Sequence, residues 1–128
     1  MNTLPLHVLV IDDNEDILFM LKAMLQHKGY RVSIKDNIIN LDANIREMSP
    51  DIILMDMLLS GADGREVCKH LKANTDLSAI PVIMLSAHPQ ARKECLEAGA
   101  DYFLEKPFEM EELYQTVSIA ENGILKAQ

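Results

Sequence analysis

The chain alternates short apolar runs with amphipathic stretches along its whole length, and this alternation limits its fold more than any other feature. The apolar runs lie at His7–Ile11, Arg31–Lys35, Asp51–Met55, Pro81–Leu85 and Asp101–Leu104. Runs this short have the length of β-strands. Three of them, containing VLVI, IILM and VIML, are continuously apolar, which is typical of parallel strands covered on both faces. The second run, RVSIK, alternates and therefore predicts an edge strand.

The stretches between these runs have the pattern of helices. In the first stretch, apolar side chains recur at the three-and-four spacing of one helix face, at Ile17, Met20, Leu21, Met24 and Leu25. Asn14 is a suitable cap for the start of this helix, and Gly29 is suited to its end. The same reasoning predicts helices at Ile38–Glu47, Asp63–Lys72, Gln90–Glu97 and Met110–Asn122.

Strands that alternate with helices predict an α/β fold, a doubly wound five-stranded parallel sheet with five helices. A chain of 128 residues has the size of one domain, so we expect a single domain over residues 1–128. Sheets of this kind bind their ligands beyond the carboxyl ends of the strands. The residues that follow each strand are therefore the first candidates for a functional site.

The formal charge of −8 argues against direct binding of nucleic acid, which needs clustered lysine and arginine side chains. No apolar run approaches the roughly 20 residues that span a bilayer, and the N-terminus lacks the pattern of a signal peptide. We therefore expect a cytoplasmic protein without a membrane partner. Cys68 and Cys95 lie far apart without metal-ligand spacing, which favours free thiols.

Polar side chains follow four of the five predicted strands. They are Asp12 and Asp13 after the first strand, Asp56 after the third, Ser86 after the fourth and Lys106 after the fifth. Adjacent carboxylates repel each other by about 4 kcal/mol at an effective dielectric constant near 20, so the acidic pair needs open solvent or a cation. Three convergent carboxylates suit Mg²⁺ or Mn²⁺. One such ion and one lysine would balance their charge, and a balanced pocket of this kind can accept a phosphoryl group.

Each of these residues has an ordinary structural explanation when it is taken alone. Asp12 or Asp13 can cap the following helix, Asp56 can belong to a turn, Ser86 can cap a helix and Lys106 can be a surface charge. Their joint placement at the ends of four strands favours a functional site.

Four segments of the chain carry a resemblance to a known family. They are Val8–Asp13 with the acidic pair, Asp51–Gly64 around Asp56, Met84–Ala87 and Lys106–Phe108. With these segments the whole chain resembles a response-regulator receiver domain of two-component signalling, similar to the chemotaxis regulators. The resemblance implies a flavodoxin-like sheet with strand order 2-1-3-4-5.

The resemblance also implies a role for each site residue. Asp56 would be the phosphoacceptor and would take the phosphoryl group from a sensor histidine kinase or a phosphotransfer protein. Asp12, Asp13, Asp56 and the main-chain carbonyl of Leu58 would hold the metal ion. Lys106 would contact a phosphoryl oxygen. The chain would then be a signalling domain that phosphorylates and dephosphorylates itself, and not an enzyme acting on other substrates.

Ser86 and Phe103 are the expected switch residues. Ser86 would donate a hydrogen bond to the phosphoryl group, and its movement would open space for the Phe103 ring. The resemblance implies that this change reshapes the surface of the fourth helix, fifth strand and fifth helix, which controls a downstream protein or output domain. It also implies a cis peptide bond between Lys106 and Pro107.

Two other functions are compatible with parts of this pattern. An aspartate-dependent, Mg²⁺-dependent phosphohydrolase also uses acidic residues and a lysine, but it needs Asp-x-Asp after its first strand, whereas Asp12 and Asp13 are adjacent. A phosphorylation-independent interaction module would retain only the fold, and such modules lack one of the acidic or lysine residues that this chain has. Both a stand-alone receiver and a receiver from a larger regulator or hybrid kinase agree with the sequence.

Overall fold

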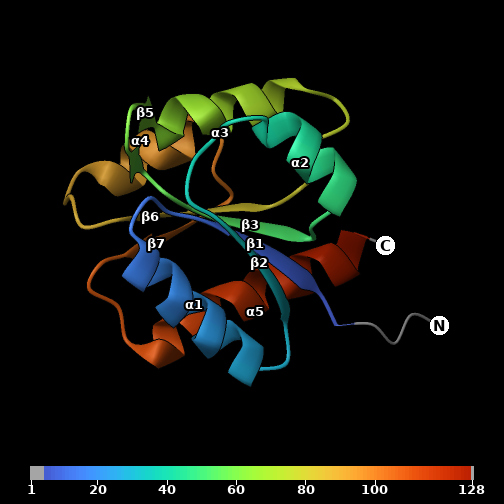
Figure 1. Ribbon diagram of the computed structural model, residues 1–128, viewed down its shortest axis with the longest axis vertical. Coiled ribbons are helices and arrows are strands. Elements are labelled where there is room, and N and C mark those ends of the chain that lie inside the picture. Colours follow the sequence, from blue (N-terminus) through green and yellow to red (C-terminus); the bar gives the residue numbers. More distant parts are fainter. Residues whose placement is uncertain (1–4, 128) are drawn as a thin grey trace.

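The computed structural model describes residues 5–127, and a five-stranded parallel sheet forms its centre (Figure 1). The strands are β1 (His7–Ile11), β2 (Arg31–Lys35), β3 (Ile52–Asp56), β6 (Val82–Ser86) and β7 (Tyr102–Glu105). Their order in the sheet is β2-β1-β3-β6-β7. Since β6 and β7 are the fourth and fifth strands of this sheet, the predicted order 2-1-3-4-5 is confirmed, and so is the edge position of β2.

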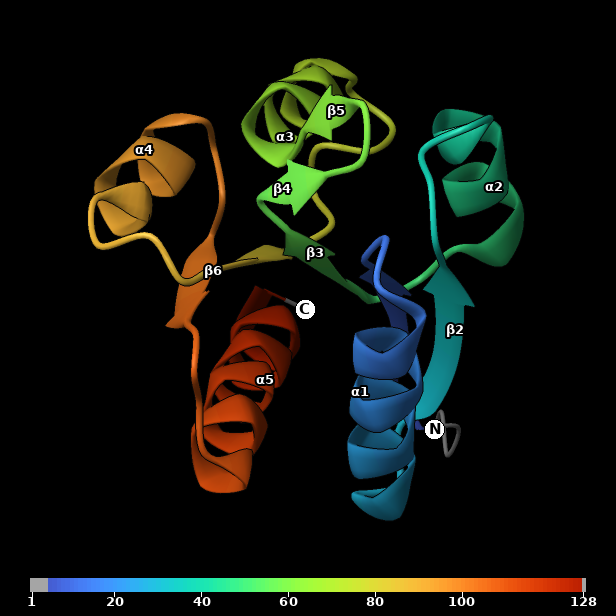
Figure 2. The ribbon, with the colours of Figure 1, turned by 60° about the vertical axis from the view of Figure 1, so that its left-hand side comes forward.

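Five helices cover the sheet. They are α1 (Glu15–His27), α2 (Leu41–Met48), α3 (Gly64–Ala73), α4 (Ala91–Glu97) and α5 (Met110–Ala127). Helices α2, α3 and α4 lie on one face, and α1 and α5 lie on the other (Figures 1 and 2). The predicted doubly wound α/β fold is therefore confirmed. Within residues 5–127, none of the helices has the length and apolar character needed to cross a membrane.

The central strands supply two cores, because successive side chains of a strand point to opposite faces. Leu9 and Ile11 of β1 are buried on the side of α2, α3 and α4. Val8 and Val10 are buried on the side of α1 and α5. This two-sided burial is the physical reason why the central strands read as continuous apolar runs.

Several predicted boundaries are wrong, and the predicted face of α1 is confirmed except at Met20, because Leu21 and Leu25 are buried and Ile17 and Met24 pack against the same core. Helix α2 begins at Leu41 and not at Ile38, because Asn40 adopts a left-handed conformation with φ 55°. Helix α5 runs to Ala127 and not to Asn122. On α1, Met20 is 47% exposed, and Leu18 is buried with Leu21 and Leu25 on the face that packs against the sheet.

A small antiparallel hairpin between β3 and α3 was not predicted. Its strands are β4 (Leu58–Leu59) and β5 (Ala62–Asp63), and Leu58 pairs with Asp63. Gly61 lies at the turn with φ +74°, a conformation that glycine adopts without steric cost. The hairpin carries the chain from Asp56 at the end of β3 to the first residue of α3.

Candidate functional site

The three predicted carboxylates come together at one edge of the sheet. Asp12 and Asp13 follow β1, and Asp56 is the last residue of the neighbouring strand β3, where Ile11 is aligned with Met55. Each carboxylate offers an oxygen atom that lies within 4.8 Å of the other two. Asp12 and Asp56 are buried, whereas Asp13 is exposed. The group is therefore open to solvent on the side of Asp13.

Asp12 is the most confined of the three. Its Oδ1 accepts a hydrogen bond of 2.9 Å from the N–H of Asn14. Its Oδ2 is buried and has no hydrogen-bond partner within the described part of the chain. Burial raises the pKa of Asp12, and the carboxylates of Asp56 and Asp13 add to this effect, whereas the N–H of Asn14 and the charge of Lys106 oppose it. A buried carboxylate oxygen without a partner is costly, so this atom is suited to contact a cation.

Lys106 supplies the one positive charge among the predicted site residues. Its Nζ donates a hydrogen bond of 2.8 Å to Asp56 Oδ1 and lies 3.7 Å from Asp12 Oδ2. The main chain places the residue, because the N–H of Lys106 donates to the carbonyl of Ser86 at 2.9 Å. The Lys106–Pro107 peptide bond is cis, as the resemblance implied. Three carboxylates and one ammonium group leave a net negative charge, which a divalent cation would neutralise.

These residues fit Mg²⁺ or Mn²⁺. Hard divalent cations bind carboxylate oxygens, and here three carboxylates converge and one of them has an unpartnered buried oxygen. Leu58, whose main-chain carbonyl is a further predicted ligand, lies at the start of the β4–β5 hairpin with its side chain 63% exposed. The role of its carbonyl stays a prediction.

The predicted switch residues lie on the two strands beyond β3. Ser86 ends β6 and is 5% exposed. Its Oγ accepts a hydrogen bond of 3.0 Å from the N–H of His88, so its hydroxyl proton remains available as a donor. Phe103 on β7 is 7% exposed and belongs to the core on the side of α4. The Arg92 guanidinium of α4 lies 5.5 Å from the centre of its ring.

The sequence did not single out Gly64, which supports the site directly. A Cβ atom on this residue would lie 2.6 Å from the main-chain oxygen of Asp56 and 2.9 Å from that of Met57. The Gly64 N–H also donates to the Met57 carbonyl at 2.6 Å. Only glycine allows α3 to start this close to the strand end that carries Asp56. The signal in the sequence is the Asp-Gly pair that ends the loop segment.

An ion-pair network beside the hairpin was also missed. Arg65 at the start of α3 donates hydrogen bonds to both carboxylate oxygens of Asp63, and it contacts Glu94 of α4 as well. The Arg65 side chain holds the pKa of Asp63 below its usual range. The network links the hairpin to α4, and sequence spacing gives no indication of it because Glu94 comes from a distant segment.

Comparisons with known proteins agree with this geometry. A family model described as the response regulator receiver domain matches residues 8–118. The DNA-binding response regulator MtrA of Mycobacterium tuberculosis (strain ATCC 25618 / H37Rv) is 33% identical over 119 residues, which are 91% of this chain and 51% of MtrA. The chain thus spans about half the length of the curated relatives it matches.

Solved structures show the same architecture. The chemotaxis protein CheY4 of Vibrio cholerae has a TM-score of 0.82 and 27% sequence identity, over 91% of this chain and 98% of CheY4. The receiver domain of the sensor histidine kinase PA1611 from Pseudomonas aeruginosa PAO1 has a TM-score of 0.79 and 30% identity, over 92% of this chain and 96% of that one. Its structure is described with a magnesium ion coordinated in the active site cleft. Sequence, fold and site agree, and the chain belongs to the family of response-regulator receiver domains of two-component signalling.

Proposed function

We propose that this receiver domain accepts a phosphoryl group on Asp56 from the phosphohistidine of a sensor histidine kinase or a phosphotransfer protein, in a reaction that requires Mg²⁺ or Mn²⁺. One observation carries the proposal. Lys106 Nζ contacts Asp56 Oδ1 at 2.8 Å, beside two further carboxylates that leave a net negative charge. An ammonium group so close to one carboxylate oxygen can also pair with a phosphoryl oxygen there.

In the proposed reaction a carboxylate oxygen of Asp56 attacks the phosphorus atom. A P–O bond forms as the P–N bond to the donor imidazole breaks, and the imidazole nitrogen keeps the electron pair of that bond. Lys106 then moves its hydrogen bond from Asp56 to a phosphoryl oxygen. When bound, the divalent cation neutralises charge on the transferred group. Asp12 and Asp13, with Asp56 and the carbonyl of Leu58, are the residues that would hold it.

The same site accounts for a switch. A new anionic group on Asp56 attracts the Ser86 hydroxyl, whose proton is free to donate. Ser86 lies directly before the loop that leads to α4, so its movement would alter the packing of Phe103 against that side. The proposed readout is a change in the surface of α4, β7 and α5, which would be recognised by a downstream protein or an output domain.

We further propose that residues 1–128 form one receiver domain. The family model covers residues 8–118, and the chain spans about half the length of MtrA. Direct nucleic-acid binding is not assigned to this domain, because its formal charge is −8.

Phosphorylation by acetyl phosphate tests the proposal. We expect the purified protein, incubated with acetyl phosphate and Mg²⁺, to gain the mass of one phosphoryl group in intact mass spectra. The adduct should be absent from Asp56→Asn and reduced in Lys106→Ala. Asp36→Asn, an acidic residue after β2 that we do not assign to the site, is the matched control and should behave as wild type.

Two outcomes would contradict the proposal. Continued hydrolysis of p-nitrophenyl phosphate by Asp56→Asn would favour a phosphohydrolase with another nucleophile. Failure to form any adduct, with no change in the NMR signals of Ser86 and Phe103 on addition of beryllofluoride and Mg²⁺, would favour an interaction module that works without phosphorylation.

A further inference from the structure

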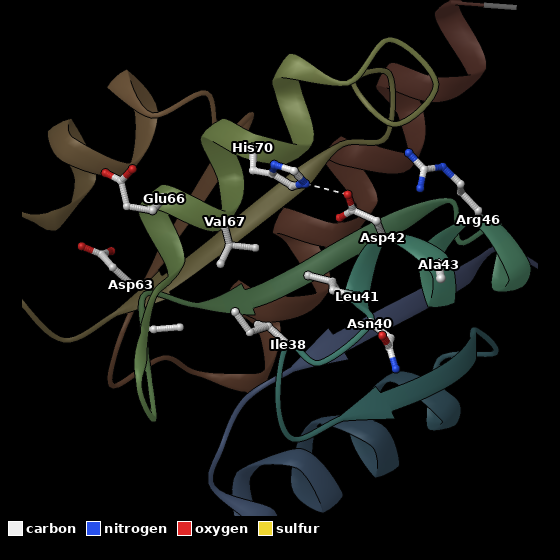
Figure 3. Close-up of a pocket in the computed structure, with 11 residues that line it drawn as sticks. Ile38, Asn40, Leu41, Asp42, Ala43, Arg46, Asp63, Glu66, Val67 and His70 are labelled. Atoms are coloured by element: carbon white, nitrogen blue, oxygen red, sulfur yellow. Dashed lines mark hydrogen bonds and ion pairs between the residues drawn. The ribbon is translucent and has the colours of Figure 1, made fainter.

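A cleft between α2 and α3 lies away from the phosphoacceptor group. It has a volume of about 680 Å³, within the range of sites that bind small molecules. Its floor is apolar and consists of Ile38, Leu41, Ala62 and Val67. Figure 3 shows Ile38, Leu41 and Val67 side by side between the two helices. We call this space the α2–α3 cleft.

The apolar floor of the cleft comes from three separate segments of the chain. Ile38 precedes α2, Ala62 belongs to β5 and Val67 belongs to α3. The side chain of Ile39, next to Ile38 in the chain, is 68% exposed. Apolar surface that the fold leaves open between rigid elements favours binding of a ligand with an apolar body.

The rim of the cleft is polar and its charge is uneven. Asp63 and Glu66 lie toward one end, and Arg46 lies at the other (Figure 3). Arg46 is already paired with Asp76 at 2.6 Å. Between these ends, the His70 ring contacts Asp42 at 2.6 Å across the two helices. The positive end is therefore neutralised within the protein.

The opposite end retains negative charge after its own cations are counted. Arg65 is shared between Asp63 and Glu94, and Lys69 is paired with Glu66 at 3.3 Å. Glu94 does not line the cleft, but because Arg65 is divided between Asp63 and Glu94, the carboxylates of Asp63, Glu66 and Glu94 have only the two cations Arg65 and Lys69 between them. The Lys69–Glu66 pair is exposed, so it is weak and can exchange its partner. A ligand that places a positive charge at this end would neutralise the remaining negative charge.

We propose that the α2–α3 cleft binds a small molecule with an apolar body and an ammonium group. The apolar body would lie on Leu41 and Val67, and the ammonium group would lie beside Asp63 and Glu66. A carboxylate at this end would meet a net negative charge instead. The cleft should therefore discriminate between amines and acids of the same shape.

The position of the cleft allows a bound ligand to influence the phosphoacceptor site through the β4–β5 hairpin. Ala62 is paired with Leu59 in the β4–β5 hairpin, and the next helix starts at Gly64 against the main chain of Asp56. A ligand that presses on Ala62 would shift the hairpin that also carries Leu58. This coupling rests on the function proposed above, whereas binding to the cleft does not.

Methyl NMR titrations test the binding. We use naphthylmethylamine as the probe and naphthylacetate as the acid of similar shape. The amine should shift the methyl signals of Ile38, Leu41 and Val67 in a saturable way without Mg²⁺, and the acid should not. Binding of naphthylacetate with equal or higher affinity, or no saturable shift with either compound, would overturn the proposal. The same holds if only a lysine-bearing helical peptide binds.

Two pairs of variants locate the probe. Ala43→Phe adds a ring to the exposed rim of α2 and should abolish binding, whereas Ala23→Phe on the exposed face of α1 should not. Glu66→Gln should weaken the affinity for the amine by about threefold, the effect of one exposed ion pair. Glu47→Gln, on α2 but outside the cleft, is its control. If all four variants bound naphthylmethylamine with equal affinity, the assigned site would be contradicted.

The coupling needs a separate measurement. At a fixed concentration of Mg²⁺, we expect beryllofluoride to change the Kd of naphthylmethylamine, and the amine to change the apparent Kd of beryllofluoride by the same factor. An unchanged Kd in both titrations would overturn the coupling. If acetyl phosphate forms no adduct on Asp56 but the amine still shifts the cleft methyl groups, the proposed function fails and the binding site stands.

Discussion

Contacts between single atoms determine how the chain packs at the end of β3 that carries Asp56, and Gly64 shows this most directly. Gly64→Ala would place a Cβ atom 2.6 Å from the main-chain oxygen of Asp56 and 2.9 Å from that of Met57. Because both neighbours are backbone atoms, the strand end or the helix must shift. We expect a loss of about 1–3 kcal/mol in the free energy of unfolding, measured by urea denaturation, with a lower yield of the acetyl phosphate adduct.

Gly61→Asn is the matched control for this substitution. Gly61 has a positive φ, unlike Gly64, and a Cβ atom there would have no neighbour within 4 Å. Asparagine tolerates this conformation better than other residues with a side chain. A Gly64→Ala variant as stable as Gly61→Asn would show that α3 does not depend on the close approach.

The buried thiol of Cys68 predicts a pH dependence of stability. Burial raises the pKa of Cys68 from 9.0 to about 11. The folded protein therefore keeps this proton while the unfolded chain loses it, so stability is fully present below pH 9 and falls as the pH rises toward 11. We expect the free energy of unfolding to decrease by up to about 2 kcal/mol over this window, measured by urea denaturation.

Cys68→Ala isolates this contribution from those of other groups. Burial also raises the pKa values of Tyr30 and Cys95, but both residues are present in the wild type and in the variant. The decrease between pH 9 and 11 should be smaller in Cys68→Ala, whatever its stability at neutral pH. The same decrease in both proteins would exclude Cys68 as its origin.

At the scale of the elements, one lysine holds the connection between α3 and β6 against the amino-terminal ends of β6 and β7. Lys72 Nζ donates to the carbonyls of Ser78 and Ile80 and pairs with Asp101 at 2.7 Å. Asp101 also accepts the N–H of Val82 at the start of β6. Lys72→Met keeps the aliphatic stem but removes the charged donor. We expect this substitution to lower the free energy of unfolding by about 1–3 kcal/mol, measured by urea denaturation.

Lys69→Met on the same helix is the control for this element. Within residues 5–127, the one ion pair of Lys69 is with Glu66, and both side chains are more than half exposed. Its removal should change stability by less than about 0.5 kcal/mol. Equal effects of the two substitutions would mean that the connection is held by other contacts.

For the whole molecule, the proposed metal site predicts that stability depends on divalent cations. An ion that binds only the folded state adds about 2.7 kcal/mol when its concentration is about 100-fold above its Kd. We therefore expect Mg²⁺ to raise the Tm of the wild type in calorimetry. Asp13→Asn removes one of the three convergent carboxylates and should reduce this gain, whereas Asp36→Asn should retain it. A Tm of the wild type that is insensitive to Mg²⁺ would contradict the metal site.

Much of this architecture could be predicted because its signals are local. The apolar runs of β1, β3 and β6 and the turn residues between the elements determine which segments form strands. Chain order with right-handed crossovers limits the sheet. The predicted helix boundaries were less reliable. Asn40 adopts a left-handed conformation, so α2 starts only at Leu41, and α5 continues through Gly123 to Ala127. The start of α2 and the end of α5 both depend on tertiary packing, about which the periodicity of the sequence gives no information.

Side-chain periodicity and chain order are readable in the sequence, so they were enough to predict the α/β fold. They also placed five site residues at strand ends: Asp12, Asp13, Asp56, Ser86 and Lys106. Three-dimensional packing was needed to show that Lys106 contacts Asp56, that Asp12 Oδ2 has no hydrogen-bond partner in the described chain, and that Gly64 lies against the main chain of Asp56. It also decided that a cleft lies between α2 and α3. These features join atoms from segments far apart in the chain, so their distances depend on how complete elements pack against one another.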